Sequence, residues 1–564
     1  MRRLAWLFFL PLVACGETPG PEDAGSDAGD PDAGLVEDDG GVVPGDAGPE
    51  GRDAGPPPPP PPIGALPRFG PDPSQCPPTA ADRGADAVHV CDCAEGADAA
   101  CVPGDDAAAG TADAPRRSLA AAATAFATGR VVALCRGGSW TPPDETSLDA
   151  SGCSSGAPCT ITDYGSADRP APLVTHPNGG ANGLSFDPRS DTAAWRGIHL
   201  SNLHLRKLGD GSGGFGVFFF RDVGDVEMRC LEVEGYAIGV HLASNGRPSG
   251  DVRLFDSSIH GNGMQGWLGG ASRTVIERNR FDDNGYFEAS NRNHNVYLSG
   301  SRDGSVVRGN WLTRSAVDAT GQCVGASLIA HNGVSVDLLV EGNLVEEENA
   351  HPGCWGINVD AAGSTTESHT RATIRGNVLR DVGNVGIGIA SCIDCVVENN
   401  VVVQTRVGGA IGIAVPNRPT TPPDADLTRA TVRNNTVVYS GAAAAGGRAY
   451  YVGERGDGYV VTNNVAYFAP PLTGDVCFEL DLAPSAYARI ESNACFGATF
   501  DRGATGLDPS PLTADPAFAA YPDDLRPGVG SPLRDSGTTA SASATDLLGI
   551  DRGGSPDRGA YEGE

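Results

Sequence analysis

Three residues suited to charge neutralisation and proton transfer lie within six positions of one another, in the segment HNVYLSG and the turn before it. They are Arg292, His294 and Tyr297. A guanidinium can neutralise a carboxylate, while an imidazole and a phenol can act as base and acid towards a carbon-bound proton and a leaving oxygen. This combination of side chains would support an elimination next to a carboxylate.

A second group offers hard oxygen ligands around the segment CWGINVD, which begins at position 354 and follows the acidic run EEEN. Carboxylate and amide oxygens are the ligands that Ca²⁺ prefers. The sequence therefore predicts a Ca²⁺ site here, although the acidic run also fits a solvated loop. The predicted ligands are Asp360, Glu346, Glu347 and Glu348.

The segments that carry these groups alternate with a period of two and are rich in Val, Ile and Leu, which predicts β-strands. Five of them read YAIGVHL, HNVYLSG, CWGINVD, VGIGIAS and GAIGIAV. Alternation places Val296 and Leu298 inward, and so Asn295 and Tyr297 outward. Strict alternation would point His294 inward. A histidine of the core or of a turn is therefore the alternative to a catalytic histidine. Tyr297 equally fits sugar stacking or strand pairing.

The same alternation predicts a groove on the outer face of these strands. Asn358 and Asp360 take outward places, followed further along by Gly386, Gly388 and Gly412. A polar face that becomes almost bare backbone beside long turns suits an extended ligand. The residues predicted to contact this ligand are Asn295, Asn358, Asp360 and Trp355.

An asparagine recurs between two apolar segments in the second half of the chain, as in TIRGNVL at 373–379. Successive copies are 23 to 35 residues apart, which predicts a solenoid with one coil per copy. Stacked coils let inward amides bond one another, so that no buried polar group is left unpaired. Weaker copies, with Ser201, Leu231 and Ser257 at the same place, bring the count to eleven coils. The predicted column contains Asn279, Asn310, Asn343, Asn377, Asn400, Asn435, Asn464 and Asn493.

This pattern resembles the right-handed parallel β-helix, or pectin-lyase-like, family, in which an asparagine ladder lines the turn between the second and third sheets. The resemblance implies an all-β solenoid of about eleven coils with an N-terminal capping helix, which the run from Ser118 to Thr128 would supply. It also implies that the outer face of the first sheet holds a polysaccharide. The terminal DLLGIDRGGSPDRGAYE is similar to the end of surface proteins of this group.

The first fifteen residues, MRRLAWLFFLPLVAC, combine two arginines with an apolar run too short to span a membrane, which is typical of an export signal. The ending LVAC resembles a bacterial lipoprotein processing site with Cys15 as the lipidated residue, and free secretion is the alternative. Gly16 favours, by resemblance, the outer membrane. We therefore expect the protein to be lipid-anchored in the outer membrane, facing either the cell surface or the periplasm.

The composition divides the rest of the chain. Residues 16–83 carry five Asp-Ala-Gly triplets and seven consecutive prolines, a composition that cannot bury a core and predicts an extended acidic tether. An N-terminal cap with the first coils is predicted for 84–196, the β-helix for 197–500 and a C-terminal β-helix-associated segment for 501–564.

Charge and cysteine content limit the partners and the compartment. The net charge is −31 and Lys207 is the one lysine, which argues against nucleic acid as a partner. We expect the protein to be a monomer. Fourteen cysteines besides Cys15 are an even number in an exported chain, so disulfides are expected. The pairs predicted are Cys153 with Cys159, Cys323 with Cys354, Cys477 with Cys495, and Cys392 with Cys395, the last ahead of a metal or redox pair.

Two functions remain open from the sequence. One is an enzyme that cleaves a uronate glycan by lyase-type β-elimination with Arg292, His294 and Tyr297. The other is a glycan-binding, adhesive or structural surface protein without catalysis. Hydrolysis is less favoured because it needs two carboxyl groups about 5 to 9.5 Å apart, and on the readable first-sheet strands only Asp360 offers itself.

Overall fold

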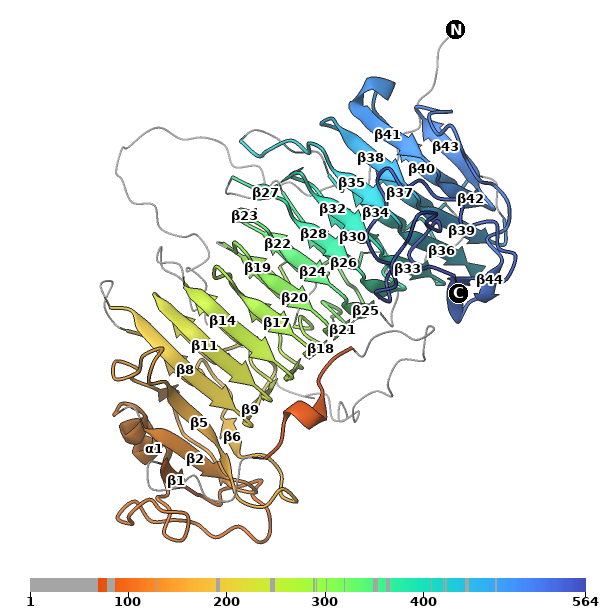
Figure 1. Cartoon of the computed structure of the whole chain (residues 1–564). Helices are drawn as coiled ribbons and strands as arrows, with labels where there is room; N and C mark the ends of the chain where they lie inside the picture. Colours follow the sequence, from red (N-terminus) through yellow and green to blue (C-terminus); the bar gives the residue numbers. More distant parts are fainter. Residues whose placement is uncertain are drawn as a thin grey trace, which may run out of the picture. The chain divides into compact units, whose positions relative to one another are not determined.

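The computed structural model describes residues 69–78 and 87–563 except for short stretches within the second range. Those stretches are 129, 189–192, 244–248, 288–289, 291, 301, 319, 348–352, 362–365, 407, 419, 421–422, 442–445 and 472–473. The described chain winds through three long parallel sheets, here called A, B and C, contributing one strand to each in turn (Figure 1). This is a right-handed parallel β-helix, as predicted.

Sheet A contains fourteen described strands: β1 (Ala87–Val90), β2 (Val131–Cys135), β5 (Cys159–Tyr164), β8 (Trp195–Ser201), β11 (Val223–Arg229), β14 (Gly250–Phe255), β17 (Val275–Glu277), β20 (Val306–Arg308), β24 (Leu339–Glu341), β28 (Thr373–Arg375), β32 (Val396–Glu398), β35 (Thr431–Arg433), β38 (Tyr459–Thr462) and β41 (Tyr487–Glu491).

Sheet B contains thirteen described strands: β3 (Ser139–Trp140), β6 (Leu173–His176), β9 (His204–Lys207), β12 (Glu232–Glu234), β15 (Ser258–His260), β18 (Arg280–Asp282), β21 (Trp311–Thr313), β25 (Leu344–Glu346), β29 (Val378–Arg380), β33 (Val401–Gln404), β36 (Thr436–Ser440), β39 (Val465–Ala469) and β42 (Ala494–Phe496).

Sheet C also contains thirteen described strands: β4 (Thr146–Ser147), β7 (Leu184–Phe186), β10 (Phe215–Phe220), β13 (Ile238–Ala243), β16 (Gln265–Leu268), β19 (His294–Ser299), β22 (Ala326–His331), β26 (Trp355–Val359), β30 (Val385–Ile389), β34 (Ile411–Val415), β37 (Arg448–Val452), β40 (Val476–Leu480) and β43 (Thr499–Gly503). The five segments that the sequence assigns to the first sheet all lie in sheet C.

Two small sheets and one α-helix complete the described elements. β23 (Val334–Val336), β27 (Ser368–Thr370) and β31 (Cys392–Ile393) pair in parallel, and β44 (Phe518–Ala520) pairs antiparallel with β45 (Asp524–Pro527). Helix α1 (Leu119–Phe126) has Ser118 as its N-cap. Its Phe126 is fully buried against Phe186, and the helix contacts β1, β2 and β4. Its role as an end cap stays a prediction. No described helix has both the length and the apolar character needed to cross a bilayer.

In the described part of the solenoid, sheets B and C each have two more strands, and sheet A three more, than the eleven coils predicted. The additional coils are the first two, where Gly138 and Pro172 occupy the ladder place in front of β3 and β6. Neither residue gives an aliphatic-Asn signal, so the sequence pattern missed both coils. In the third coil the ladder place belongs to Leu203, which aligns with Leu231, and the assignment of Ser201 to it is wrong by two residues.

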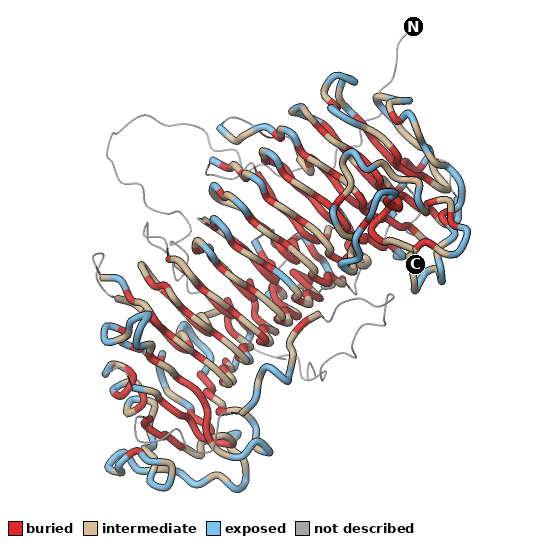
Figure 2. Tube along the Cα trace, viewed as in Figure 1, coloured by how far each residue is buried: buried red, intermediate tan, exposed pale blue. Residues whose placement is uncertain are grey.

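One apolar core runs along the inside of the coils, and buried residues line the strands of all three sheets (Figure 2). Inside this core the eight predicted asparagines form one continuous column at the turn between sheets A and B. In each step the Nδ2 of one asparagine donates to the Oδ1 of the next at 2.9 to 3.1 Å. All eight are 0 % exposed, so the column satisfies its amides internally.

The residue before each ladder asparagine has a left-handed backbone, with φ between 53° and 64°. Glycine and asparagine tolerate this conformation best, and they occupy six of these eight positions. The chain thereby turns sharply between sheets A and B in every coil. The line of these turns is called the ridge below.

Seven disulfides link the described cysteines, including the four predicted pairs. The others join Cys91 to Cys135, Cys93 to Cys101 and Cys76 to Cys230. The last bond holds residues 69–78 against the solenoid, although the sequence places them in the tether. Residues 1–68, with Cys15 and the predicted export signal, lie outside the described residues.

Candidate functional site

The strands of sheet C depart from strict alternation at one position in every coil from β13 to β43. Pairing runs from His294 and Ala326 directly to Val296 and Leu328, and the residue between is skipped. The same gap recurs in the neighbouring strands. Two successive side chains therefore point inward at this place. As a result, the residues of the strand before it face the opposite side from the one that strict alternation predicts.

This irregularity corrects several orientations predicted from alternation. Asn295 points inward, because its Nδ2 donates to Thr313 O at 3.0 Å and its Oδ1 accepts from Asn284 at 2.8 Å. Gly386 and Gly412 also face the core, since a Cβ built on either would approach core valine methyls at 3.0 and 2.5 Å. The outer strip of bare glycine backbone predicted along sheet C is therefore wrong for these two positions.

His294 lies on the outer face with Tyr297, not on the inner one. The two rings meet edge to face with centroids 5.1 Å apart, and Tyr297 packs in a small outer cluster with Ala326 and Ile329. The Nδ1 of His294 accepts a hydrogen bond from Ala326 N at 3.0 Å. Arg292 is exposed in the turn before β19. The structure therefore brings His294 and Tyr297 together.

A polar group lies further along the same face, where the strands of sheet C end and the chain turns towards sheet A. We call it the edge cluster. It is framed by the ends of β19, β22, β26 and β34 and by the small sheet β23-β27-β31. Its members are Tyr297, Arg302, His331, Asn358, Asp360, Glu367, His369 and Arg418.

Glu367 lies at the centre of the edge cluster and is 0 % exposed. One of its oxygens lies 2.9 Å from Nε2 of His331 and accepts from Asn332 N at 3.1 Å, and the other lies 3.8 Å from Nε2 of His369. Burial raises the pKa of Glu367 to about 7 and lowers the pKa of His331 to about 4. Both shifts favour neutral forms, so between about pH 4 and pH 7 a protonated carboxyl group lies beside an unprotonated imidazole.

Asp360 is the second carboxylate of the edge cluster. Arg418 lies 2.7 Å from it, and Ala361 N donates to it at 2.9 Å. Burial raises the pKa of Asp360, and Arg418 opposes part of that rise. The Arg418 side chain is 38 % exposed, and its guanidinium lies 5.7 Å from the centre of the half-buried Trp355 ring. This pair is the exposed border of the cluster.

The remaining members connect these groups. Asn332 donates to the Tyr297 hydroxyl at 2.5 Å, and Asn417 donates to Asn358. Arg302 is buried and donates to the carbonyls of Gly300 and His331 at 2.7 and 2.9 Å, while burial lowers its pKa to about 10. The cluster therefore combines two carboxyl groups, a phenol, two imidazoles and two guanidiniums at one edge.

Buried polar atoms without a hydrogen bond are concentrated in this region of the described chain. Five of the eighteen in the described residues belong to the edge cluster and the adjacent Asn417. Such atoms cost free energy, and a catalytic or binding role is one reason for a folded protein to retain them. The five are Arg302 Nε, His331 Nε2, Glu367 Oε2, Asn417 Oδ1 and Arg418 Nε, of which His331 Nε2 and Arg418 Nε lie within ion-pair distance of carboxylates.

The residues predicted to bind Ca²⁺ lie in different environments. Glu346 is on sheet B, where it accepts from Trp311 Nε1 at 3.1 Å and from Arg380 at 3.2 Å. Glu347 is 1 % exposed and accepts from Ser315 N at 3.1 Å. Glu348 lies outside the described residues. Among described side chains, the one group with three or more candidate ligand atoms close together consists of disulfide cysteines, so Ca²⁺ stays a prediction.

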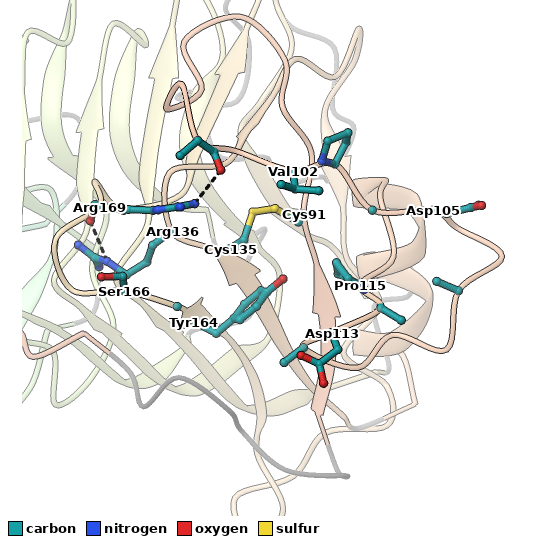
Figure 3. Close-up of a pocket in the computed structure, with 17 residues that line it drawn as sticks. Cys91, Val102, Asp105, Asp113, Pro115, Cys135, Arg136, Tyr164, Ser166 and Arg169 are labelled. Atoms are coloured by element: carbon teal, nitrogen blue, oxygen red, sulfur yellow. Dashed lines mark hydrogen bonds between the residues drawn. A yellow bond between two sulfur atoms is a disulfide. The ribbon is translucent and has the colours of Figure 1, made fainter.

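A hollow of about 590 Å³ lies far from the edge cluster in sequence, among the first coils (Figure 3). It is lined by the Cys91–Cys135 disulfide, Tyr164 and Arg169, with the loop around Val102 on one side. Arg169 donates to Ala100 O at 3.2 Å across it. The hollow has no paired carboxyl groups comparable to Glu367 and Asp360, so we place the candidate site at the edge cluster.

Tyr297, Asn358 and Asp360, which were singled out from the sequence, lie in the edge cluster, and Trp355 lies at its border. Sequence reasoning missed Arg302, His331, Glu367, His369 and Arg418. Of these, Arg302, Glu367 and Arg418 come from connections outside the regular strands, where alternation predicts nothing. His331 was missed because its strand, β22, was not among those read from the sequence. The detectable signal was the segment ESHT, in which Glu367 and His369 are two residues apart and so share one face of a strand.

No protein-family model matches the sequence, and the comparison with curated proteins gives no match. Among solved structures the chain is similar to the pectate lyase Pel9A, with 14% identity and a TM-score of 0.33 over 85% of this chain and 98% of that one. It is similar to the PL6 family alginate lyase AlyGC, with 14% identity and a TM-score of 0.45 over 79% and 58%. It is similar also to PfbA, a surface adhesin of Streptococcus pneumoniae, with 11% identity and a TM-score of 0.35 over 69% and 89%. These distant likenesses assign neither an activity nor a ligand to this chain.

Proposed function

We propose that this protein acts on an extracellular polysaccharide at the edge cluster. The observation that carries the proposal is the concentration of incompletely hydrogen-bonded buried polar atoms around Glu367 and Asp360, next to the half-buried Arg418 and Trp355. A guanidinium beside an aromatic ring suits a sugar that carries a carboxylate, because the cation pairs with the charge and the ring packs on the apolar face of the sugar. A uronate-rich glycan is therefore the preferred ligand.

The outer face of sheet C supports an extended ligand of this kind. Phe218 and His241 on earlier strands form a half-buried aromatic group with centroids 5.4 Å apart, and Leu268 and Tyr297 continue the same register. Successive strands are about 4.8 Å apart, so these side chains offer contacts at regular intervals along the solenoid. A chain lying on them would reach the edge cluster.

Two chemistries fit the edge cluster. In β-elimination, Arg418 would neutralise the uronate carboxylate, and Tyr297 with the adjacent His294 would transfer the protons. In hydrolysis, Glu367 would act as the acid and Asp360 as the carboxylate partner. The second carboxyl group, absent from the sequence-based reading, is what brings hydrolysis back beside elimination.

The test is incubation of the full chain with uronate-containing and neutral polysaccharides, with and without chelator. New ends that absorb in the ultraviolet identify elimination, new reducing ends without that absorbance identify hydrolysis, and retention without new ends identifies binding. Loss of cleavage with chelator would support the proposed Ca²⁺. If no polysaccharide is retained or cleaved, the proposed function is wrong.

Variants locate the chemistry. If the reaction is hydrolysis, Glu367→Gln and Asp360→Asn should lower its rate by about 10² or more. If the reaction is elimination, Tyr297→Phe should lower its rate by the same factor. Asp337→Asn is the matched control, because Asp337 forms an exposed ion pair with Arg371 in the same region of the solenoid. Equal activity in all four variants and in the wild type would place the chemistry elsewhere.

A further inference from the structure

Residues 69–78 lie along the side of the solenoid instead of joining it at its first coil. Gly70 N donates to Gly309 O at 2.9 Å, Asp72 N donates to Asp256 Oδ1 at 3.3 Å, and Pro77 O accepts from Asn202 Nδ2 at 3.2 Å. All three partners have a left-handed backbone: Gly309 belongs to the ridge, and Asp256 and Asn202 take the equivalent place in coils without a ladder asparagine. We call residues 69–78 the strap.

The strap runs against the direction of the coils. It begins at the coil of Gly309, continues past Asp256 and the Cys76–Cys230 disulfide, and reaches the coil of Asn202. It starts beside Trp311, whose Cβ would lie 3.4 Å from a Cβ built on Gly70. Gly70 has φ +78°, so glycine suits both the backbone and the close approach.

The disulfide closes a loop that contains the whole beginning of the solenoid. Cys76 and Cys230 are 154 residues apart in sequence, and strands β1 to β11 with helix α1 lie between them. A covalent path therefore leads from the strap directly to the start of β12. Everything from residue 77 to residue 229 lies outside that path.

From this topology we propose that the strap is a load-bearing attachment. A pull on the segment that precedes Phe69 passes through Cys76 to Cys230 and enters the solenoid at its side, and the first coils with helix α1 carry none of it. The composition of residues 16–68, acidic and proline-rich, is that of a tether, which is the kind of segment that transmits such a pull. This inference does not depend on the proposed function.

Sideways attachment changes which hydrogen bonds resist the pull. In a parallel β-helix the bonds between neighbouring strands run along the solenoid axis, so a pull on the first coil along the axis would open them one coil at a time. A pull that enters through the Cys76–Cys230 disulfide bypasses the coils before β12, so it does not act on the bonds between those coils. Because of the strap, the first coils of the solenoid do not bear the pulling force.

The proposal predicts the length of the extended chain when the full protein is pulled between its N- and C-termini. In the double variant Cys76→Ser with Cys230→Ser, residues 77–229 join the extension. The Cys91–Cys135 and Cys153–Cys159 disulfides keep 44 and 6 residues closed, so 104 of the 154 are added. At about 3.6 Å for each residue, the fully extended chain should lengthen by roughly 370 Å.

The double variant Cys153→Ser with Cys159→Ser is the matched control. It opens a disulfide inside the bypassed loop, so its extension should equal that of the wild type. Lengthening of the control, or no lengthening of the Cys76/Cys230 variant, would overturn the proposal. If the Cys76/Cys230 variant does not fold, wild type pulled after reduction replaces it. Reduction also releases 31, 3 and 18 residues at the Cys323–Cys354, Cys392–Cys395 and Cys477–Cys495 disulfides, so a lengthening no greater than these residues supply contradicts the load path equally.

Discussion

Replacing Asn377 by leucine tests whether the asparagine column holds the coils together. The Oδ1 of Asn377 accepts from both the backbone N and the Nδ2 of Asn343, each at 2.9 Å. Leucine removes this acceptor and leaves two buried donors, each costing about 1 to 3 kcal/mol. Burial of the added apolar surface returns about 1 to 2 kcal/mol. We expect Asn377→Leu to lower the free energy of unfolding by about 3 kcal/mol.

Asn377→Asp separates the acceptor role of this side chain from its donor role. The Nδ2 of Asn377 donates to Val340 O, Arg375 O and Asn400 Oδ1 at 2.9 to 3.1 Å. An aspartate keeps one acceptor for Asn343 but directs a carboxylate at these three oxygens, which raises its native pKa above the unfolded value of about 3.9. The loss of stability relative to wild type should therefore be small below about pH 4 and should grow as the pH rises through the raised native pKa.

Urea unfolding followed by circular dichroism measures both variants, with Asn178→Leu as the control because Asn178 is exposed in the loop after β6. Asn417 is unsuitable as a control because it bonds Asn358. If Asn377→Leu and Asn178→Leu lower the urea midpoint equally, the column is not buried. A loss in Asn377→Asp that does not change with pH would show that its donor role is not satisfied as described.

Three further predictions concern other parts of the chain. Asp508 accepts from the N and Nδ2 of Asn493 at 2.9 and 3.0 Å. Asp508→Ala should therefore lower the free energy of unfolding in urea by about 2 to 4 kcal/mol. Hydrogen exchange should show the last coil opening first, and an unaffected last coil would contradict this. Burial raises the pKa of Glu367 to about 7, so wild type should lose stability relative to Glu367→Gln as the pH rises from 4.5 to 7, and parallel pH profiles would refute the burial argument. Cys15→Ser should release the protein from the membrane fraction, and full retention would point to another anchor.

The repeat was predictable because it depends on local chemistry that every coil repeats. The spacing of asparagine between aliphatic residues gave the column and the order of strands around it. The first coils lack that signal, since Gly138 and Pro172 stand at the ladder place, and so they could not be counted. The end of the column was equally hidden: Asp508 lies fifteen residues after Asn493 and shares no motif with it, yet the last amide needs an acceptor only, which a carboxylate supplies.

The side-chain orientations on sheet C were predictable only where the backbone alternates. Val296 and Leu298 point inward as expected, but the skipped pairing position turns Asn295 inward as well and His294 outward. The residues of a single strand do not indicate this irregularity, because it arises from the pairing between neighbouring coils. A one-residue departure is enough to exchange the two faces of a strand.

The place of the edge cluster follows from where a solenoid can depart from its repeat. Along the strands each position is fixed by the neighbours above and below, and polar groups there must form ladders, as the asparagines do. At the ends of the sheet C strands the chain is free to insert the extra strands β23, β27 and β31, which bring Glu367 and His369 beside Asp360. Those groups cannot form a ladder, because no neighbouring coil supplies an equivalent residue, and their polar atoms remain incompletely paired. Removing the irregularity should therefore remove the site and leave the solenoid: replacing the Glu367 and His369 side chains by threonine should abolish glycan retention or cleavage with little change in circular dichroism. A variant that loses its β-helix spectrum would show that the edge cluster is part of the scaffold.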